Sequence, residues 1–288
     1  MKKRPLLIYI ILLLLAVTAV YINHFHNGFH FDDTHSIVDN PSIRSLKNVP
    51  KFFADGTTSS VLPQNQAYRP VVTTSLAVDY ALGNGYDLFA FHFITFLLFL
   101  VQGLLMFVLY KKLLSISSSN QCIGYVALLA VAWYMLHPAI AETINYIIAR
   151  SDVQSTVAVL AAFVLYIRSP FCRKTFLYLI PVGIGTLAKP PSVMFAPLFF
   201  FYVLFFEEQV GLTDIFKKAH LKQFGNSILK SIPAFIFCGA MYLVISKLTP
   251  KTWEPGGTSP IQYLITQPYV ILHYFGTFFW PTGLSADS

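Results

Sequence analysis

The stretch Phe29-His30-Phe31-Asp32-Asp33-Thr34-His35 organises the chain, because it directly follows the first long apolar run. Two adjacent carboxylates and two histidines therefore lie within a few residues of a membrane surface. Placing charge there is costly unless the charge is solvated, paired or used. Two interpretations stay open: the acids belong to a site beside a cavity, or they solvate the end of a helix.

The composition of the 288 residues predicts an integral membrane protein. Hydrophobic residues make up 55% of the chain and charged residues only 11%, and the mean hydropathy is +0.60. An average soluble protein is about 25% charged, so this chain has too few charges to cover a water-soluble surface. The 27 Phe and 16 Tyr residues are typical of chains whose aromatic rings sit at bilayer interfaces.

The net charge of +7 comes from short basic runs, a pattern typical of loops on the cytoplasmic side. This distribution of the basic residues in short, separate runs excludes a nucleic-acid-binding protein, which would need a basic stripe on a soluble domain. The three cysteines are far apart, which suits neither a zinc site nor a disulfide framework, so we interpret them as structural. The basic runs are Lys2-Lys3-Arg4, Lys111-Lys112, Arg173-Lys174 and Lys217-Lys218.

The apolar runs predict an all-α bundle of about eight membrane spans in a single domain. The first run could be a cleaved secretory signal, but an uncleaved helix is favoured because many spans follow it. A long outer loop, residues 23–87, separates the first two spans, and the apolar spacing predicts amphipathic helices at 43–53 and 70–82 that lie on the membrane. The predicted spans are 5–22, 88–110, 122–137, 153–167, 175–188, 192–206, 230–246 and 268–280.

The run 175–206 is too long for one span and is broken by Lys189-Pro190-Pro191. Both of its flanks are basic, so we expect it to cross twice as two short helices, with Lys189 near the outer turn. Each half is shorter than the ~20 residues that a full span needs. A broken helix at membrane depth is tolerated only against protein or a cavity. Lys189 is therefore a site candidate on physical grounds.

Polar residues gather at the predicted outer ends of the apolar runs. If the predicted topology holds, all of them face one side of the membrane, which suits an anionic substrate delivered within the bilayer. The set is Asp32, Asp33, Arg69, His92, His137, Glu142, Asn145, Arg150, Asp152 and Lys189.

Chemistry suggests a role for each member of this set. A carboxylate beside a cavity can act as general base towards a hydroxyl. Successive side chains of an extended segment point in opposite directions, so we expect only one of Asp32 and Asp33 to face the cavity. Arg69, Arg150 and Lys189 can hold a phosphate.

For several members a structural role is an equal alternative. Arg150 and Asp152 could be a solvated pair at a helix start. His92 and His137 could donate hydrogen bonds to a phosphate, but His92 could also be a simple interfacial histidine. Glu142 and Asn145 are three residues apart and share a helical face, which could simply be the water-facing side. The sequence has neither the phosphate-binding loop nor the zinc motif of common enzymes, and nothing indicates a redox cofactor.

An ordered set of short motifs resembles a known family. The resemblance is to the membrane part of the transmembrane-and-tetratricopeptide-repeat (TMTC-type) protein O-mannosyltransferases and their bacterial relatives, which have the GT-C glycosyltransferase fold. It spans most of the chain. The motifs are Phe31-Asp32-Asp33, Asn40-Pro41, Tyr68-Arg69-Pro70, Phe91-His92, His137-Pro138 with Glu142, Arg150-Ser151-Asp152 and Ala188-Lys189.

The resemblance implies a multispanning enzyme that moves a sugar from a polyprenyl-phosphate donor to a hydroxyl of a protein or glycan, with inversion at the anomeric carbon. It makes Asp32 or Asp33 the catalytic base. No cofactor is implied beyond the lipid-linked sugar, and we expect no metal, because a lipid monophosphate has no diphosphate for a metal to bridge. The remaining matched positions would bind the donor phosphate or shape the cavity: Arg69, His92, His137, Glu142, Arg150, Asp152 and Lys189.

The chain departs from the family pattern in two ways. Pro190 stands where family members usually carry an acidic residue, and no tetratricopeptide repeat is present. The final residues, Leu284 to Asp287, resemble a motif from the middle of the family's proteins, so we expect a truncated chain. We also expect a bacterial inner membrane, a cytoplasmic N-terminus and a site on the outer face.

Two rival functions remain. A transporter or flippase for an anionic lipid or solute would also use a broken helix, but transporters often have internal repeats and midplane charges. This chain shows no repeat, and its charges lie at the outer ends of the spans, which favours the enzyme. The other rival is an inactive membrane scaffold left by truncation.

Overall fold

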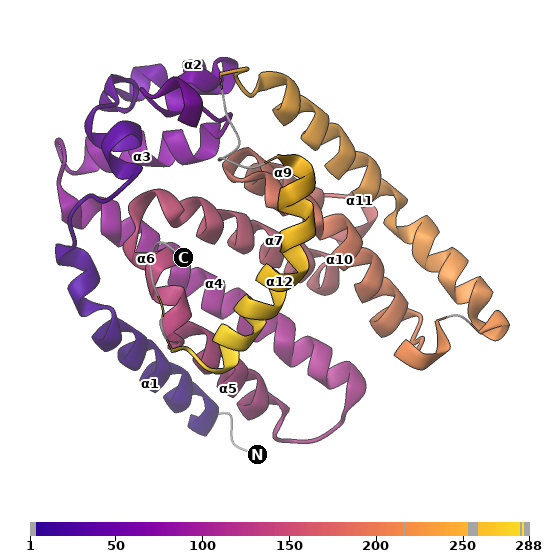
Figure 1. Ribbon diagram of the computed structural model, residues 1–288. Helices are drawn as coiled ribbons and strands as arrows, with labels where there is room; N and C mark the ends of the chain where they lie inside the picture. The colour runs from indigo at the N-terminus through magenta and orange to yellow at the C-terminus, as the bar shows by residue number, and fades with distance from the viewer. Residues whose placement is uncertain (1–3, 216, 253–258, 283, 285–288) are drawn as a thin grey trace.

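The fold is all-α, as the sequence predicts. The computed structural model describes residues 4–215, 217–252, 259–282 and 284, and no strand occurs in this part of the chain. All eight predicted apolar segments contain helix (Figure 1). These helices are α1 (Arg4–Val20), α4 (Leu88–Ser117), α5 (Ile123–Met135), α7 (Arg150–Arg168), α9 (Leu179–Ala188), α10 (Phe195–Tyr202), α11 (Leu221–Leu248) and α12 (Pro260–Phe279).

Among the residues that the structure describes, four helical segments are long and apolar enough to cross a membrane: Leu88–Ser117, Ile147–Arg168, Pro190–Glu207 and Lys218–Leu248. A fifth results if the bent pair Ile123–Met135 and Pro138–Asn145 is one span, while α1 and α9 are apolar but shorter. The chain is thus a multispanning membrane protein, and the number of eight crossings stays a prediction.

Helix α7 lies at the centre of the bundle and packs against both α4 and α9. Aromatic rings fill much of the core: Tyr166 meets Phe199 at 4.6 Å between ring centroids, and Phe163 meets Phe195 at 4.9 Å. Lipid tails are as apolar as these side chains, so close packing, rather than escape from water, holds such helices together. The rings therefore fix how α7 sits against α10.

Gly185 allows α9 to approach α7 closely. A Cβ atom at this position would lie 2.5 Å from Cβ of Ala158 on α7 and 2.7 Å from Oγ of Ser192. That Ser192 hydroxyl lies 2.7 Å from Oγ of Ser155, which adds a buried hydrogen bond at the same contact. Gly185 thus serves helix packing.

The run 175–206 leaves one end of α7 and returns to it. At the start of α9, Tyr178 packs on Tyr166 with ring centroids 5.0 Å apart. After α10, Glu207 lies 3.6 Å from Arg173, just beyond the C-terminus of α7. Lys189, between the two halves, is at the opposite end of α7. The predicted break is therefore present, with its turn at Lys189.

The outer loop forms most of a second apolar core, which also includes residues of α4, of α9 and of the segment before α7. The loop contains α2 (Val49–Ala54), α3 (Pro70–Leu82) and short 3-10 turns that include Pro41–Arg44 and Leu46–Asn48. Figure 1 shows α2 and α3 together above the ends of the long helices. The buried apolar residues of this core are Ile37, Ile43, Phe52, Val72, Leu76, Ala77, Phe91, Ile147 and Ala188.

Helix α3 has the boundaries that the sequence predicts. Val72, Leu76 and Ala77 are at most 2% exposed and pack inside the loop core. The apolar face of α3 is therefore covered by protein, and the expectation that this helix rests on the membrane stays a prediction. The segment 43–53 is helical only in pieces: two 3-10 turns lead into α2.

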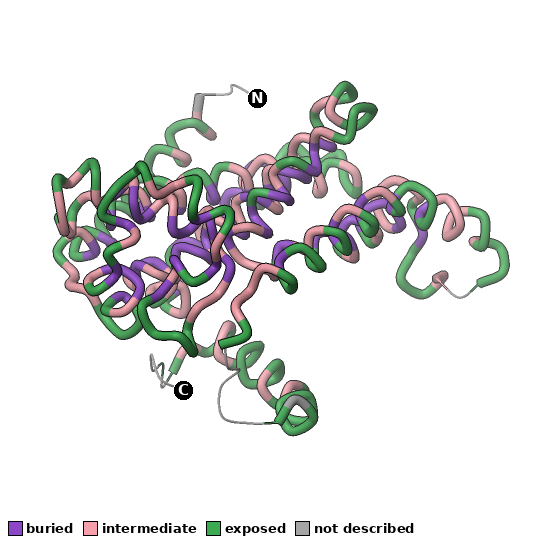
Figure 2. The backbone as a smooth tube through the Cα atoms, turned by 90° about the horizontal axis from the view of Figure 1, so that it is seen from above, coloured by how far each residue is buried: buried purple, intermediate pink, exposed green. Residues whose placement is uncertain are grey.

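Helix α12 lies outside the bundle and is exposed along most of its length (Figure 2). Thr252, shortly before it, donates a 3.2 Å hydrogen bond to Gln66 of the outer loop. Near its C-terminus, the Phe278 ring stacks on His137 with centroids 4.8 Å apart. Both contacts are with residues from the predicted outer ends of the spans, and α12 is not among the helices apolar enough to span. The predicted eighth crossing therefore gains no support.

Candidate functional site

The acidic loop is tied to the segment that precedes α7. The Asp33 carboxylate is buried and accepts N–H bonds from His30 (3.1 Å) and Ile148 (2.9 Å). The backbone N–H of Asp32 donates to the Tyr146 hydroxyl at 2.8 Å. Burial raises the pKa of Asp33, and the N–H bonds oppose that shift. Asp33 thus braces the loop, and Asp32 is the acid of the pair whose carboxylate is open.

The Asp32 carboxylate is open to its surroundings, with 55% of the side chain exposed. The backbone before it is strained, because Phe31 has a φ of 46°, in the left-handed region that a bulky residue rarely adopts. The Phe31 ring also packs edge-on against Tyr146, with centroids 5.9 Å apart. Such strain is typical of functional sites, where the surrounding structure holds it.

His35 holds the Asp32 carboxylate from one side. Its Nε2 lies 3.1 Å from Asp32 Oδ1, and its Nδ1 lies 2.9 Å from Oγ of Ser60 and 3.1 Å from Oγ of Ser36. If a serine hydroxyl donates to Nδ1, the neutral ring carries its proton on Nε2 and donates it to Asp32. His35 was not among the predicted site residues, although its position three residues after Asp32 could have indicated the contact.

Lys189 and Asp152 form an ion pair at the broken helix. The Lys189 Nζ lies 2.6 Å from both carboxylate oxygens of Asp152. Lys189 has an extended backbone between α9 and the next turn, with φ −153° and ψ 130°. The two prolines that follow keep the helix from continuing. The pair is partly open, with 27% of the lysine side chain and 45% of the aspartate side chain exposed.

Arg69 lies within electrostatic range of both Asp152 and Asp32. The guanidinium is largely buried; burial lowers its pKa, and the negative charges of Asp152 and Asp32 oppose that shift. Its Nε has no hydrogen-bond partner in the described part of the chain. A buried donor without a partner is costly, so a ligand acceptor would be favourable there.

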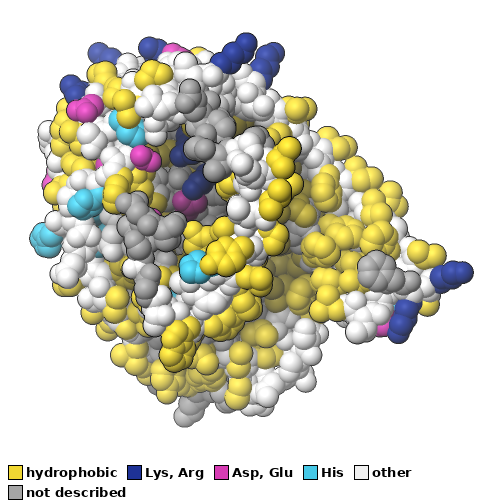
Figure 3. Space-filling model, viewed as in Figure 1, with side chains coloured by type: hydrophobic (Ala, Val, Ile, Leu, Met, Phe, Trp, Pro, Cys, Tyr) yellow, Lys and Arg dark blue, Asp and Glu magenta, His cyan; other side chains and the backbone are white. Residues whose placement is uncertain are grey.

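A cavity of about 430 Å³ lies beside Arg69. Pro190 and the C-terminal part of α11 complete its wall, which carries the hydroxyls of Tyr242, Ser246 and Thr249 and the Lys251 ammonium. Figure 3 shows basic and acidic side chains next to each other in a hollow beside α12. The wall of this cavity thus offers two cations, Arg69 and Lys251, together with hydroxyl groups.

Arg150 has a different role from the ones that the sequence offered. It is fully buried and bound on all sides: Nη1 donates to the Asp79 carboxylate, Nη2 to the Phe91 carbonyl (2.6 Å) and Nε to the Ile147 carbonyl (3.3 Å). The solvated pair with Asp152 is not formed, and no donor nitrogen is directed to a ligand. Arg150 instead locks α7 to α3 and α4. Asp79, the one carboxylate on the buried face of α3, was the sequence signal for this contact.

The two predicted histidines do not join this site. His92 is fully buried, and its Nε2 lies 2.9 Å from the Asn27 carbonyl, so the ring faces other protein groups. The Nδ1 of His137 accepts the N–H of Ala139 at 3.2 Å, and its ring is covered by Phe278. Both contacts are structural, while His92 Nδ1 and His137 Nε2 have no hydrogen-bond partner among the described residues.

Glu142 and Asn145 share α6 (Ala141–Asn145), as their spacing predicts. Glu142 is exposed, while the Asn145 side chain accepts hydrogen bonds from His24 (3.2 Å) and Asn27 (3.0 Å). The structure thus brings together Asp32, Arg69, Asp152 and Lys189 of the predicted set. It places His92, His137, Glu142 and Arg150 in other surroundings.

Comparisons with known proteins point in the direction that the motifs predict. The chain is 25% identical over 191 residues to the human protein O-mannosyl-transferase TMTC3, a match that covers 62% of this chain and 20% of the human protein. A protein O-mannosyl-transferase of Caenorhabditis elegans is 26% identical over 192 residues, which covers 65% of this chain and 27% of the worm protein. This chain is similar to TMTC-type protein O-mannosyl-transferases.

The similarity covers only part of these relatives, because the chain spans less than a third of their length. Human TMTC2 is 28% identical over 156 residues, with 17% of its own length covered. No protein-family model matches the chain, and no solved structure matches it. The predicted resemblance is confirmed, while the GT-C fold and the bacterial inner membrane stay predictions; the relatives named here are eukaryotic.

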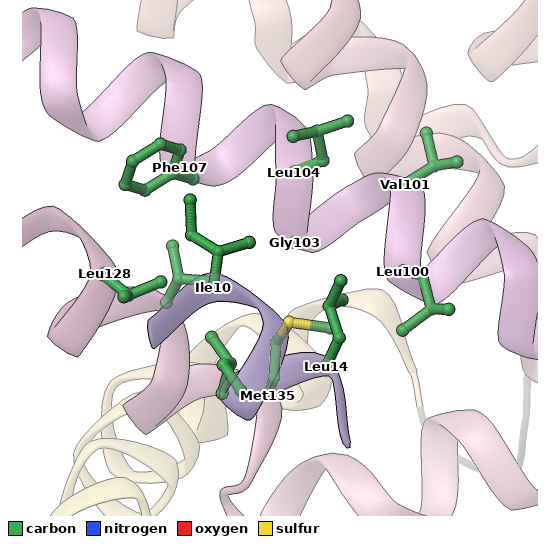
Figure 4. A pocket seen from close by; sticks show the side chains of 11 residues that line it. Ile10, Leu14, Leu100, Val101, Gly103, Leu104, Phe107, Leu128 and Met135 are labelled. Carbon is green, nitrogen blue, oxygen red and sulfur yellow. The ribbon is translucent and has the colours of Figure 1, made fainter. Parts of the chain in front are cut away.

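A second cavity, of about 240 Å³, lies between α1, α4 and α5 (Figure 4). Ile10, Leu14, Phe107 and Leu128 are among its lining side chains, all of which are apolar. With no group that could transfer a proton or bind an anion, this cavity is no candidate for catalysis.

No group of three or more His, Cys, Asp or Glu side chains is arranged for a metal ion in the residues that the structure describes. The sequence analysis expects metal-free chemistry, and that expectation stays a prediction. Activity in excess chelator tests it, since a complete loss that added metal restores would refute it.

Proposed function

We propose that this chain is the membrane part of a glycosyltransferase that moves a sugar from a polyprenyl-phosphate donor to a hydroxyl acceptor on a protein. The names of its relatives favour mannose as the sugar. The observation that carries the proposal is the placement of the exposed Asp32 carboxylate near Arg69, whose buried Nε has no hydrogen-bond partner among the described residues.

Asp32 is the general base in this proposal. The acceptor oxygen attacks the anomeric carbon of the sugar as its proton passes to the Asp32 carboxylate. The bond between that carbon and the phosphate oxygen breaks, its electron pair stays on the oxygen, and polyprenyl phosphate leaves. A single displacement of this kind inverts the anomeric centre. Asp33 takes no part, because its oxygens already accept backbone N–H groups.

Arg69 and Lys189 stabilise the departing phosphate. Negative charge grows on the phosphate oxygen as the sugar leaves, and fixed cations aimed at that oxygen lower the barrier. The planar guanidinium of Arg69 fits two phosphate oxygens. The Lys189 ammonium has three N–H groups, and Asp152 can occupy two of them, so one remains for the phosphate.

The test uses the 288-residue chain purified in detergent, with radiolabelled polyprenyl-phosphate mannose as donor and a membrane protein extract as acceptor. We expect label in protein with wild type, and loss of transfer but not of donor binding with Asp32→Asn. Lys230→Gln is the matched control, because Lys230 pairs with Glu207 at the other end of the bundle.

Two results would overturn the proposal. One is wild-type chain that binds the donor without cleaving it and instead moves it across a vesicle membrane, which would support the transporter. The other is Asp32→Asn with wild-type transfer, which would make the acidic loop structural.

A further inference from the structure

A third cavity, of about 520 Å³, lies at the end of the bundle opposite Lys189 and Asp152. Lys111 and Lys112 near the C-terminus of α4 line it together with Arg168, the last residue of α7. Helix α7 has 19 residues, and at 1.5 Å per residue it places this cavity roughly 28 Å from the candidate active site. The two sites are therefore separate.

The three cations around this cavity have no acidic partner in the described part of the chain. Their neighbours at the same end differ in this respect: Arg173 pairs with Glu207, and Lys230 with both Glu207 and Glu208. Other unpaired cations exist there, but these three surround a single cavity. Three like charges at one cavity repel each other, so an anion between them would be favourable.

The remaining lining fits the headgroup of a lipid. Asn120 and Gln121 add amide groups that can bond phosphate or glycerol oxygens, while Ile123 and Ile167 form an apolar side. Ile123 begins α5, whose outer face exposes Val126, Leu129 and Trp133. Basic pockets between membrane helices on the cytoplasmic side are suited to anionic headgroups. A free phosphate would use the cations but not the apolar side.

We propose that Lys111, Lys112 and Arg168 form a binding site for the phosphate headgroup of an anionic phospholipid, in the leaflet opposite the candidate active site. The acyl chains run along the exposed apolar face of α5. The site anchors the bundle at a fixed depth and does not depend on the proposed transferase activity.

The experiment measures phosphatidylglycerol binding to the whole chain by native mass spectrometry from detergent, with phosphatidylcholine and inorganic phosphate as separate probes. The triple variant Lys111→Gln, Lys112→Gln, Arg168→Gln should bind phosphatidylglycerol about a hundredfold more weakly. A matched variant, Lys174→Gln, Lys218→Gln, Lys222→Gln, loses the same charge from exposed positions that do not line the cavity and should bind it like wild type.

Thermal unfolding without added lipid checks that both triple variants fold. Equal losses in the two variants would show that only total charge matters and would overturn the site. Tight binding of phosphatidylcholine would also overturn it. If inorganic phosphate binds as tightly as phosphatidylglycerol, the site is one for a free anion, and the lipid proposal is overturned.

Discussion

The Lys189 ammonium lies 2.6 Å from each carboxylate oxygen of Asp152, at the break that separates α9 from α10. Because both side chains are partly exposed, this ion pair stabilises the fold by no more than about 1 kcal/mol. Interrupting a helix loses more free energy than such a weak ion pair returns. The pair is better explained by what the lysine can bind.

Lys189→Gln should therefore separate activity from stability. We expect the thermal unfolding midpoint in detergent to stay near that of wild type, since the lost pair is weak. Transfer should fall by about 10²-fold, the usual effect of losing one fixed donor to developing charge. A variant that unfolds early and transfers normally once folded would show that the pair is structural.

The two adjacent aspartates should respond in opposite ways to the same change. Asp32→Asn should keep its stability and lose about 10²–10⁴-fold in transfer rate, because an amide cannot accept the proton. Asp33→Asn should be less stable by about 1–3 kcal/mol, because the amide NH₂ would face a backbone N–H. Unfolding curves and transfer rates for both variants decide between them, and the reversed pattern would make Asp33 the base.

His35 should act through Asp32 and not through the donor. His35→Ala removes the hydrogen bond that orients the carboxylate, so kcat should fall about tenfold while KM for the donor stays the same. His35→Gln keeps an N–H donor near the carboxylate and should recover part of the lost rate. Ser60→Ala removes one of two hydroxyls from Nδ1 and should have a smaller effect. A rise in donor KM with constant kcat would contradict this positioning role.

Removing one member of the buried Arg150–Asp79 pair should lower the free energy of unfolding much more than replacing both members. Arg150→Met leaves the Asp79 carboxylate buried without its partner and should cost about 3–5 kcal/mol of unfolding free energy. The double variant Arg150→Met, Asp79→Leu removes both charges and should recover most of that loss. Chemical unfolding of the three proteins measures both effects. A double variant no more stable than Arg150→Met would argue against the pair as the cause.

Gly185 should not tolerate a side chain, whereas Gly239 should. Gly185→Ala would push against Ala158 and Ser192 and should destabilise the chain by about 1–3 kcal/mol. Gly239, inside α11, has open space around a Cβ, so Gly239→Ala should be neutral or stabilise the helix by up to about 1 kcal/mol. Equal melting temperatures for the two variants would show that α9 does not depend on this close contact.

The sequence predicts those features that depend on neighbouring residues. The break at Lys189 follows from two prolines in an apolar run, and the acidic loop from carboxylates placed directly after a helix. The bundle of apolar helices follows from the spacing of apolar runs. In each case the deciding residues are within one turn or one span of each other.

Features that depend on tertiary contacts were not predicted. Arg150 has Asp152 two residues away, yet its partner is Asp79, which is 71 residues distant in the chain. His92 lies at a predicted helix end but is covered by the turn that carries Asn27. Whether a polar residue at a membrane boundary faces a ligand or another segment depends on packing that local patterns do not contain.

The Arg150–Asp79 contact has a consequence for how sequences of this kind can diverge. A change at either position alone strands a charge inside the protein, and a change at both removes the problem. Descendants that keep this fold should therefore carry both residues or neither. The two positions, on different helices, are then inherited together. If a distant sequence carries both residues, the ion pair between α3 and α7 was present in the common ancestor.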